Sequence, residues 1–255
     1  MKILSYNVNG IRAALSKDLL SYLKEANADV VCLQEIKAMP EQIDPDAFGP
    51  LGYHLQWYPA QKKGYSGVAI LSRQKPLAVH EGCGHELFDA EGRVLRCDFE
   101  EGSVISAYFP SGTSGDERQG VKYEFLEHFH GYCQGLLQSG VERLAIAGDY
   151  NICHQAIDIH DPVSNKNSTG FLPEERQWMD AWFQSGFVDS FRHLHPEPHR
   201  YTWWSYRAGA RSKNKGWRID YISLSSKWAE KLRSSGIDDF AVHSDHCPLW
   251  AVLDQ

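Results

Sequence analysis

The chain has 255 residues, of which 42% are hydrophobic and 23% are charged, and its formal net charge is −7 at pH 7. This apolar content excludes an intrinsically disordered protein, and a chain of this length can bury a large core without disulfides or structural metals. No run approaches the roughly 18 apolar residues of a membrane span, and the N-terminal residues turn polar at Ser5, so we expect neither a membrane span nor a signal peptide.

The predicted strands are short runs rich in Val, Ile, Tyr and Trp that are bounded by turn residues. In chain order they cover residues 3–8, 29–34, 54–58, 68–72, 94–99, 104–108, 144–148, 201–204, 219–224 and 249–253. The predicted helices cover residues 14–26, 119–138, 174–185 and 227–234. The third of these helices follows Pro173 and starts with two acids, which suit the positive end of a helix dipole.

The number and spacing of these elements predict an α/β protein with two sheets. Hairpin-like spacings, as in residues 53–72 and 94–108, indicate antiparallel pairs, so mixed sheets are expected rather than purely parallel ones. Two sheets packed face to face, with helices outside them, would bury this many strands. We expect residues 1–255 to form a single domain.

The six cysteines are scattered without a C-x-x-C pair, and most fall in apolar, strand-like runs. This pattern is typical of reduced, buried thiols in a reducing compartment, and it disfavours a disulfide framework or a zinc site. We therefore expect a soluble, cytoplasmic protein, which would be associated with the nucleoid if the source is bacterial.

Polar side chains stand where several predicted strands begin or end. They are Asn7, Asn9, Glu35, Asp149, Asn151 and Asp220, and Ser244-Asp245-His246 directly precedes the last predicted strand. One such acid would ordinarily be a turn residue or a helix cap, but functional residues gather at the strand ends of layered α/β proteins. If these groups converge, their carboxylates need a cation or a proton to coexist, and oxygen ligands suit Mg²⁺ or Mn²⁺ rather than Zn²⁺.

Motifs for other reactions are missing from the sequence. The Ser66-Gly67 and Ser111-Gly112 pairs are not part of a G-x-S-x-G motif, which disfavours a serine hydrolase. The sequence has no Walker A loop and no G-x-G-x-x-G motif, so a nucleotide cofactor has no support.

Basic residues gather in two windows of an acidic chain. Residues 61–75 hold four basic residues and residues 200–218 hold six, and neither window contains an acid. A charge run is usually a solvated loop, but the second window interleaves its cations with Tyr201, Trp203, Trp204, Tyr206 and Trp217. Aromatic rings beside cations suit stacking on bases or sugars together with phosphate neutralisation, so a localised nucleic-acid-binding face is plausible. We expect one of the two adjacent tryptophans to lie near the surface.

Eight motifs are spread along the chain between residues 7 and 248: NVNGIRA (7–13), LQEIK (33–37), GYSGVAILS (64–72), YFPSG (108–112), GDYNI (148–152), GFLPEER (170–176), WRIDY (217–221) and SDHCP (244–248). This set resembles the exonuclease III family of abasic-site (AP) endonucleases, within the endonuclease/exonuclease/phosphatase superfamily that includes deoxyribonuclease I. The resemblance implies a four-layer α/β sandwich, with two mixed β-sheets packed face to face and flanked by helices. It also implies Mg²⁺-dependent hydrolysis of the DNA backbone 5′ to an abasic site, leaving a 3′-hydroxyl.

The same resemblance implies which residues surround the metal. Glu35 matches the family's direct metal ligand, Asn7 and Asp245 match groups near the metal, and Asn9 matches a supporting position. Mg²⁺ is the implied cofactor, and Mn²⁺ is a possible substitute.

The resemblance further implies the residues that act on the phosphate. Asp149 matches the residue that positions or deprotonates the attacking water, and Asn151 matches its amide partner. His246 paired with Asp220 matches the dyad that contacts the scissile phosphate, and Tyr108 matches a phenol on the phosphate side.

For substrate binding, the resemblance implies an apolar pocket for a flipped abasic sugar and a set of backbone and groove contacts. The pocket positions are Trp203, Trp217 and Ile219, Asn165 matches a phosphate-contacting amide, and the DNA-contacting positions are Arg12, Lys37, Gly64 and Tyr65. The implied partner is double-stranded DNA with abasic sites or blocked 3′ ends, bound by a monomer away from any membrane.

Two departures leave the balance of activities open. Ser168 and Asp161 stand where some relatives have amides, in the expected loop between Asp149 and Gly170. The main hypothesis is an AP endonuclease with 3′→5′ exonuclease and 3′-phosphatase activity. The second is an enzyme acting mainly as a 3′→5′ exonuclease. The third, a catalytically silent nucleic-acid-binding regulator, would be expected to have lost site carboxylates, and these are present.

Overall fold

Two six-stranded sheets form the centre of the structure, a computed structural model that describes residues 1–254. The first sheet has the order β11 (Leu232–Ile237), β12 (Leu249–Leu253), β1 (Lys2–Asn7), β2 (Val30–Gln34), β4 (Val68–Ser72) and β3 (His54–Tyr58). The second has the order β5 (Ala78–Glu81), β6 (Val94–Asp98), β7 (Ser103–Tyr108), β8 (Leu144–Asp149), β10 (Asp220–Ser225) and β9 (Phe187–Asp189). The pairs β1–β2 and β7–β8 are parallel and the other neighbouring strands are antiparallel, so both sheets are mixed, as predicted.

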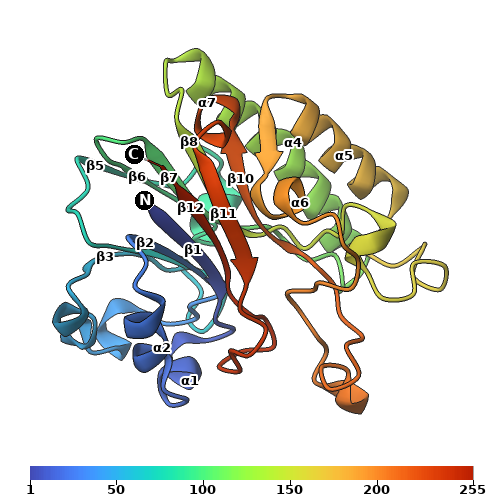
Figure 1. Cartoon of the computed structure of the whole chain (residues 1–255), viewed down its shortest axis with the longest axis horizontal. Coiled ribbons are helices and arrows are strands. Elements are labelled where there is room, and N and C mark those ends of the chain that lie inside the picture. The colour runs from blue at the N-terminus through green and yellow to red at the C-terminus, as the bar shows by residue number, and fades with distance from the viewer. Residues whose placement is uncertain (255) are drawn as a thin grey trace.

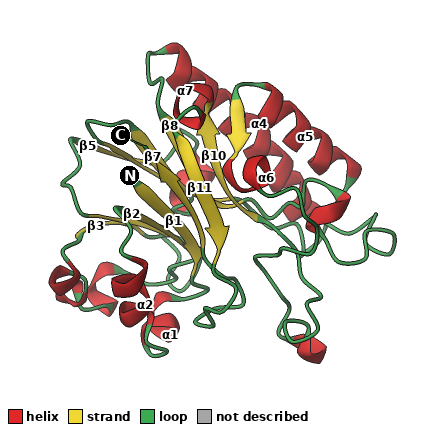
Figure 2. Cartoon of the chain, viewed as in Figure 1, coloured by secondary structure: helices red, strands yellow, loops and turns green. Residues whose placement is uncertain are grey.

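Helices cover the outer face of each sheet (Figures 1 and 2). The first sheet carries α1 (Ile11–Leu15) and α2 (Leu19–Ala26), and the second carries α4 (Asp116–Gln138) and α5 (Pro173–Gln184), which lie side by side. The shorter helices are α3 (Glu86–Ala90), α6 (Ser190–Leu194) and α7 (Ser226–Ala229), and 3₁₀ turns cover Pro40–Gln42, Pro45–Ala47, Gly49–Leu51, Ala156–Asp158 and Arg207–Gly209. The resulting order of helices, sheet, sheet and helices is the four-layer sandwich that the family resemblance implied.

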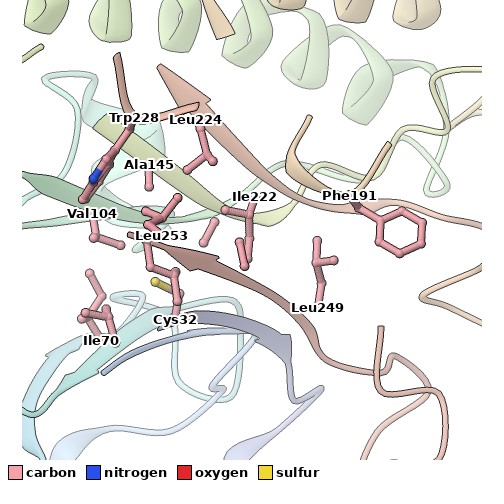
Figure 3. Close-up of a cluster of buried hydrophobic side chains, with 14 of the residues drawn as sticks. Cys32, Ile70, Val104, Ala145, Phe191, Ile222, Leu224, Trp228, Leu249 and Leu253 are labelled. Carbon is pink, nitrogen blue, oxygen red and sulfur yellow. The ribbon is translucent and has the colours of Figure 1, made fainter. Parts of the chain in front are cut away.

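Alternating apolar side chains explain why each sheet is covered on both faces. In β2, Val30 and Cys32 pack into the core between the sheets, whereas Val31 and Leu33 pack outward among the side chains of α1 and α2. Figure 3 shows the inter-sheet core, in which Cys32, Ile70 and Leu253 of the first sheet lie on one side and Val104, Ala145 and Leu224 of the second sheet lie on the other. All six cysteines are buried and free, as expected. Within residues 1–254, none of the helices is both long and apolar enough to cross a membrane.

Three segment predictions are wrong. The helix expected at 14–26 is two helices, because the backbone turns left-handed at Asp18 (φ 67°) between α1 and α2. Residues 201–204 do not form a strand, and Trp203 makes only isolated bridges with Trp217 and His246. The helix expected at 227–234 ends at Ala229, and the chain then enters β11.

The sequence analysis also missed β5, β9 and β11, and each of these is an edge strand: β5 and β9 form the two edges of the second sheet, and β11 forms one edge of the first. An edge strand has one neighbour, and it carries fewer of the apolar residues by which strands are recognised. β11, with the sequence LRSSGI, illustrates this, because only two of its residues are buried.

Candidate active site

The candidate active site lies at the edge where strands of both sheets bring their polar ends together. Because β1 and β2 are parallel, Asn7 at the end of β1 lies beside the end of β2, which Glu35 directly follows. Because β7 and β8 are parallel, Tyr108 lies opposite Asp149. β10 runs antiparallel to β8, and its first residue, Asp220, pairs with Asp149. Strand direction alone therefore gathers these five side chains.

The amide of Asn7 links the two sheets at the centre of the site. Its Nδ2 atom donates to Glu35 Oε1 and to Asp149 Oδ2, both at 2.9 Å. The other oxygen of Glu35 lies 2.7 Å from Lys37 Nζ. Asn7 is 0% exposed and Asp149 is 1% exposed, so this bridge is shielded from water.

A buried histidine lies between two aspartates. His246 Nδ1 is 2.9 Å from Asp220 Oδ2, and His246 Nε2 is 3.8 Å from Asp149 Oδ2. Although burial alone would lower it, the pKa of His246 is raised to about 10 by the charge and hydrogen bond of Asp220 and by Asp149. The imidazole is therefore doubly protonated at neutral pH, and its Nε2–H points toward the reaction centre.

Burial and the Asp220 carboxylate raise the pKa of Asp149 to about 7, with a smaller contribution from Glu35, while the charge of His246 opposes the rise. Ligand atoms of Glu35, Asp149 and His246 all lie within 4.8 Å of one another. Three neighbouring carboxylates with one imidazolium carry an excess of negative charge, which a divalent cation would neutralise. The carboxylates of this group therefore fit an oxygen-liganded metal, whereas the proton on His246 disqualifies that ring as a ligand.

Two further side chains support this centre. The Asn151 backbone N–H donates to Asp149 Oδ1 at 2.8 Å, and Asn151 Nδ2 donates to the Phe109 carbonyl at 2.9 Å. Burial and the Glu35 carboxylate raise the pKa of the Tyr108 phenol well above its usual value, so the phenol keeps its proton.

Tyr108 is held by Arg93, which the sequence analysis missed. Arg93 is 1% exposed, its guanidinium lies 4.9 Å from the centre of the Tyr108 ring, and its Nη1 donates to the Tyr108 carbonyl at 2.8 Å. Within the sequence Arg93 is one cation beside a strand, and no local pattern separates it from a surface arginine.

Asp245 and Asn9 lie beside the centre rather than in it. Asp245 accepts hydrogen bonds from Asn9 Nδ2 at 2.9 Å and from Trp203 Nε1 at 3.0 Å, and Lys37 Nζ donates to Asn9 Oδ1 at 2.6 Å. Burial alone would raise the pKa of Asp245, but the charge of His246 and these two hydrogen bonds lower it. Contact of Asp245 and Asn9 with a metal stays a prediction.

Left-handed backbone marks the loops that carry the site. Asn9, Glu35, Lys37 and Asn151 all have positive φ, between 43° and 53°. Such conformations are unfavourable for residues other than glycine and persist only where the surroundings enforce them, most often at functional sites.

A cavity of about 460 Å³ opens beside these groups. Trp203, Trp217 and Ile219 form its apolar wall, and the two indole rings stand at 88° to each other with centres 6.0 Å apart. Trp203 is partly exposed and Trp204 is 4% exposed, which confirms that one of the pair stays near the surface. The structure thus brings the three predicted pocket residues together.

The cavity lining also contains hydroxyl groups, which the sequence analysis did not identify as pocket residues. They belong to Ser111, Thr113, Ser168 and Thr169. Ser111 stands inside the YFPSG motif and Thr169 directly precedes GFLPEER, so their place beside family motifs is the only signal that the sequence offers.

The predicted DNA-contacting residues lie around this edge in different settings. Arg12 is exposed on α1, and Lys37 is tied to Glu35. Gly64 is exposed next to Tyr65, whose hydroxyl lies 3.2 Å from Arg93 Nη2 and 3.1 Å from Arg118 Nη2.

Asn165 is a predicted site residue that the structure leaves outside the cavity lining. Its Nδ2 donates to the carbonyls of His160 and Asp161, both at 3.0 Å, and its Oδ1 accepts from Ser168 Oγ at 3.3 Å. It therefore adjoins the cavity through Ser168, and its contact with phosphate stays a prediction.

The basic window at 200–218 is less available to a polyanion than its composition indicates. Arg218 is 0% exposed and binds Asp158 at 2.7 Å and Asp189 at 2.8 Å. Arg211 donates to the carbonyls of Ser244, Asp239 and Ala241, which fixes the loop before His246. The exposed cations of this window are Arg207, Lys213 and Lys215.

Both the sequence and the fold are similar to those of known proteins. A model of the Endonuclease/Exonuclease/phosphatase family matches residues 4–246. The chain is 43% identical over 256 residues to an exodeoxyribonuclease of Bacillus subtilis, with both chains fully covered. It is 38% identical over 258 residues to a DNA-(apurinic or apyrimidinic site) endonuclease of Dictyostelium discoideum, covering all of this chain and 71% of that protein. A solved 3′ phosphatase from Neisseria, bound to a product DNA hairpin, matches over both full chains with a TM-score of 0.93 and 29% identity.

Proposed function

The chain belongs to the endonuclease/exonuclease/phosphatase family, and we propose that it is a metal-dependent AP endonuclease that hydrolyses the DNA backbone 5′ to an abasic site and leaves a 3′-hydroxyl. It is a hydrolase of a nuclease family, and DNA is its substrate. The observation that carries the proposal is the buried group of Glu35, Asp149 and His246 beside a cavity with a tryptophan wall.

The metal belongs next to Glu35. The Glu35 carboxylate would hold Mg²⁺, or Mn²⁺ in its place, and the amide of Asn7 fixes this carboxylate. Lys37 pairs with Glu35 and donates to Asn9, and Asn9 in turn donates to Asp245, so Asn9 and Asp245 would support the metal site. When bound, the ion would act as a Lewis acid that neutralises charge on the phosphate and on the departing 3′-oxygen.

The side chains around this position supply the proton transfers. Asp149 Oδ2 accepts a proton from the attacking water, and a pKa of about 7 matches that role, while the Asn151 N–H holds Oδ1. His246 Nε2–H donates to a phosphate oxygen, and Asp220 on Nδ1 keeps the ring charged and oriented. The Tyr108 phenol, which keeps its proton, donates a second hydrogen bond to the phosphate.

The cavity accounts for the choice of an abasic site. An apolar wall of Trp203, Trp217 and Ile219 suits a sugar that has lost its base, and turning such a sugar out of the helix is least costly because no base has to be unstacked. Backbone and groove contacts on either side would come from Arg12, Lys37, Gly64, Tyr65 and Asn165.

A second candidate uses the same site on DNA ends. The hydroxyl groups in the cavity lining would receive a polar terminal group, and one relative is named an exodeoxyribonuclease. This 3′→5′ exonuclease or 3′-phosphatase activity is compatible with the first proposal and is not favoured over it.

We further propose that residues 1–255 act as one domain and as a monomer, on double-stranded DNA with abasic sites or blocked 3′ ends, in the cytoplasm. A shared core between the two sheets and a site built from both sheets support the single domain. The buried, free cysteines support a reducing compartment.

Cleavage of a synthetic duplex with one abasic site, in Mg²⁺ and in EDTA, tests the proposal. Glu35→Ala and His246→Ala should each lose about two or more orders of magnitude in rate. Glu25→Ala, which removes an exposed acid on α2, is the matched control and should cleave like the unchanged chain. Wild-type turnover in both site variants would refute the assignment, and a recessed 3′ end offered in parallel separates the second candidate.

A further inference from the structure

A buried ion pair joins the two outer helices directly beneath the active-site loops. Lys122 of α4 and Glu175 of α5 are both 0% exposed, and Lys122 Nζ lies 2.5 Å from Glu175 Oε1. Figure 1 shows the two helices side by side on the outer face of the second sheet. Neither residue touches the cavity, so the pair does not belong to the reacting groups.

Lys122 holds the backbone that orients Asp149. Its Nζ also donates to the Asn151 carbonyl at 2.8 Å. Asn151 is left-handed, with φ 53°, and its own N–H holds Asp149 Oδ1 at 2.8 Å. A cation that pulls the Asn151 carbonyl toward α4 therefore helps to set the peptide that points the carboxylate of Asp149.

Glu175 holds the segment that carries Gly170, a residue of the cavity lining. Its Oε2 atom accepts from the backbone N–H groups of Gly170 at 2.6 Å and of Leu172 at 3.0 Å. Gly170 has φ 90°, and a Cβ there would lie 3.0 Å from the Trp217 ring and 3.1 Å from the Asn151 carbonyl oxygen, so its backbone packs closely against both residues. The carboxylate thus holds the 170–172 backbone beside a pocket tryptophan and beside Asn151.

Gln119 extends the same network to the cavity wall. Its Nε2 donates to Glu175 Oε1 at 3.0 Å, and its Oε1 accepts from the Thr169 hydroxyl at 2.6 Å. Thr169 lines the cavity. Glu175 therefore accepts four hydrogen bonds. Two come from side chains of α4, Gln119 and Lys122, and two come from the backbone of Gly170 and Leu172.

Stability alone does not account for such a pair. The desolvation of two buried charges offsets most of their attraction, and an uncharged pair of similar volume often folds equally well. What an uncharged pair cannot reproduce is the chain of contacts in which Lys122 donates to the Asn151 carbonyl and to Glu175, while Glu175 accepts from the Gly170 and Leu172 amides.

We propose that Lys122 and Glu175 are positioning residues that set the separation between Asp149 and the Thr169–Gly170 wall of the pocket. The inference rests on the proposed function for its kinetic consequence, and on the geometry alone for its structural one. A bound phosphodiester must meet the carboxylate of Asp149 in line, and an error of about 1 Å in such a placement lowers a rate by up to about 100-fold.

The double variant Lys122→Met/Glu175→Gln tests the proposal. It removes both charges at nearly constant volume, and the glutamine oxygen can still accept from Gly170 and Leu172, whereas the Asn151 carbonyl loses its donor. We expect kcat on abasic duplex to fall by about 10- to 100-fold, with KM within about threefold, because the DNA-contacting surface is unchanged. Leu23→Ala is the control for a loss of stability, because it opens a cavity under the buried face of α2, which covers the other sheet. It should leave kcat and KM unchanged.

Hydrogen exchange provides a readout that needs no activity. Amides of residues 149–152 and 169–172 should exchange faster in the double variant than in the unchanged chain, and not in Leu23→Ala. A double variant with unaltered kcat and unaltered exchange overturns the proposal. If the unchanged chain fails to cleave abasic DNA, the proposed function falls, and the exchange experiment still decides the inference. If the double variant does not fold, the single variants Lys122→Arg and Glu175→Gln take its place. Each must lower kcat without changing KM, with the smaller loss in Lys122→Arg, and otherwise the proposal is wrong.

Discussion

Replacing Asp220 by asparagine removes a charge from the site while keeping its shape. In the structure Asp220 Oδ2 accepts from His246 Nδ1 at 2.9 Å, and an asparagine oxygen can accept the same bond. Asp220 is 1% exposed, and its Oδ1 atom has no hydrogen-bond partner among the described residues, so the new amide group displaces no contact. The substitution therefore tests the charge of Asp220 separately from its position.

The expected magnitude follows from the pKa of His246. Asp220 is the largest influence that raises this pKa from 6.5 to about 10, and burial is the largest influence that lowers it. Without the charge of Asp220 the pKa of His246 falls, because burial is then opposed only by the weaker contributions of Asp149 and Asp245, and the ring loses its proton at a lower pH. The loss of one charged donor to the phosphate should lower kcat by about 100- to 1,000-fold at about pH 8.

The pH–rate profile gives the diagnostic sign. The unchanged chain should keep its activity up to a basic limb near the His246 pKa of about 10, whereas the basic limb of Asp220→Asn should lie at a clearly lower pH. Asp180→Asn is the matched control, because Asp180 accepts from buried His154 at 2.7 Å away from the site, and its profile should not change. A basic limb at the wild-type position in Asp220→Asn would refute the role given to the imidazolium.

Three further predictions concern stability and selectivity. Because burial and Asp220 raise the pKa of Asp149 to about 7 from 3.8, protonation of this group stabilises the metal-free chain in acid, and this stabilisation is lost as the pH rises through about 7. Urea unfolding should show a loss of about 1 kcal/mol from this group between about pH 6 and about pH 8, absent in Asp149→Asn and reduced by Mg²⁺. Trp217→Ala opens the apolar wall, so the preference in kcat/KM for abasic over intact duplex should fall by about tenfold. Arg218→Met leaves Asp158 buried beside one arginine fewer and should lower the free energy of unfolding by about 3 to 5 kcal/mol in urea titrations, whereas a loss below about 1 kcal/mol contradicts the buried pair.

The elements that could be predicted from sequence are those whose apolar residues face a core on both sides. The central strands β2, β4, β8 and β12 were found within one residue of their ends, because each is flanked by packed side chains on both faces. The errors fall where tertiary contacts replace a local pattern. Residues 201–204 carry Tyr, Thr and two Trp, which favour a strand, but Trp203 makes only isolated bridges and packs in the small cluster of loop residues, while Trp204 packs into the core between the sheets without a strand partner.

The candidate site was predictable to the extent that its residues sit at strand ends. Glu35, Asp149 and Asp220 stand at the ends of apolar runs, and their convergence follows from the order and direction of the strands. Lys122 and Arg93 could not be found in this way. Each is a cation in a segment that reads as ordinary helix or strand. Lys122 pairs with Glu175, 53 residues away, and Arg93 contacts Tyr108 of the next strand, so only the packed structure shows that the two cations are buried.

Backbone conformation shows most directly why the site needs the whole fold. Asparagine tolerates a left-handed backbone, so positive φ costs little at Asn9 and Asn151. For Glu35 and Lys37 the same conformation is unfavourable, and no local interaction of these residue types favours it. Their conformations are held by backbone hydrogen bonds, with the Lys37 N–H donating to the Ser66 carbonyl at 2.9 Å and the Glu35 carbonyl accepting from Gly10 at 2.7 Å. The strained loop after β2 is thus fixed by segments that follow β1 and precede β4. A carboxylate placed by two neighbouring strands in this way is already fixed for a metal and a phosphate, which is the form of preorganisation that an in-line displacement requires.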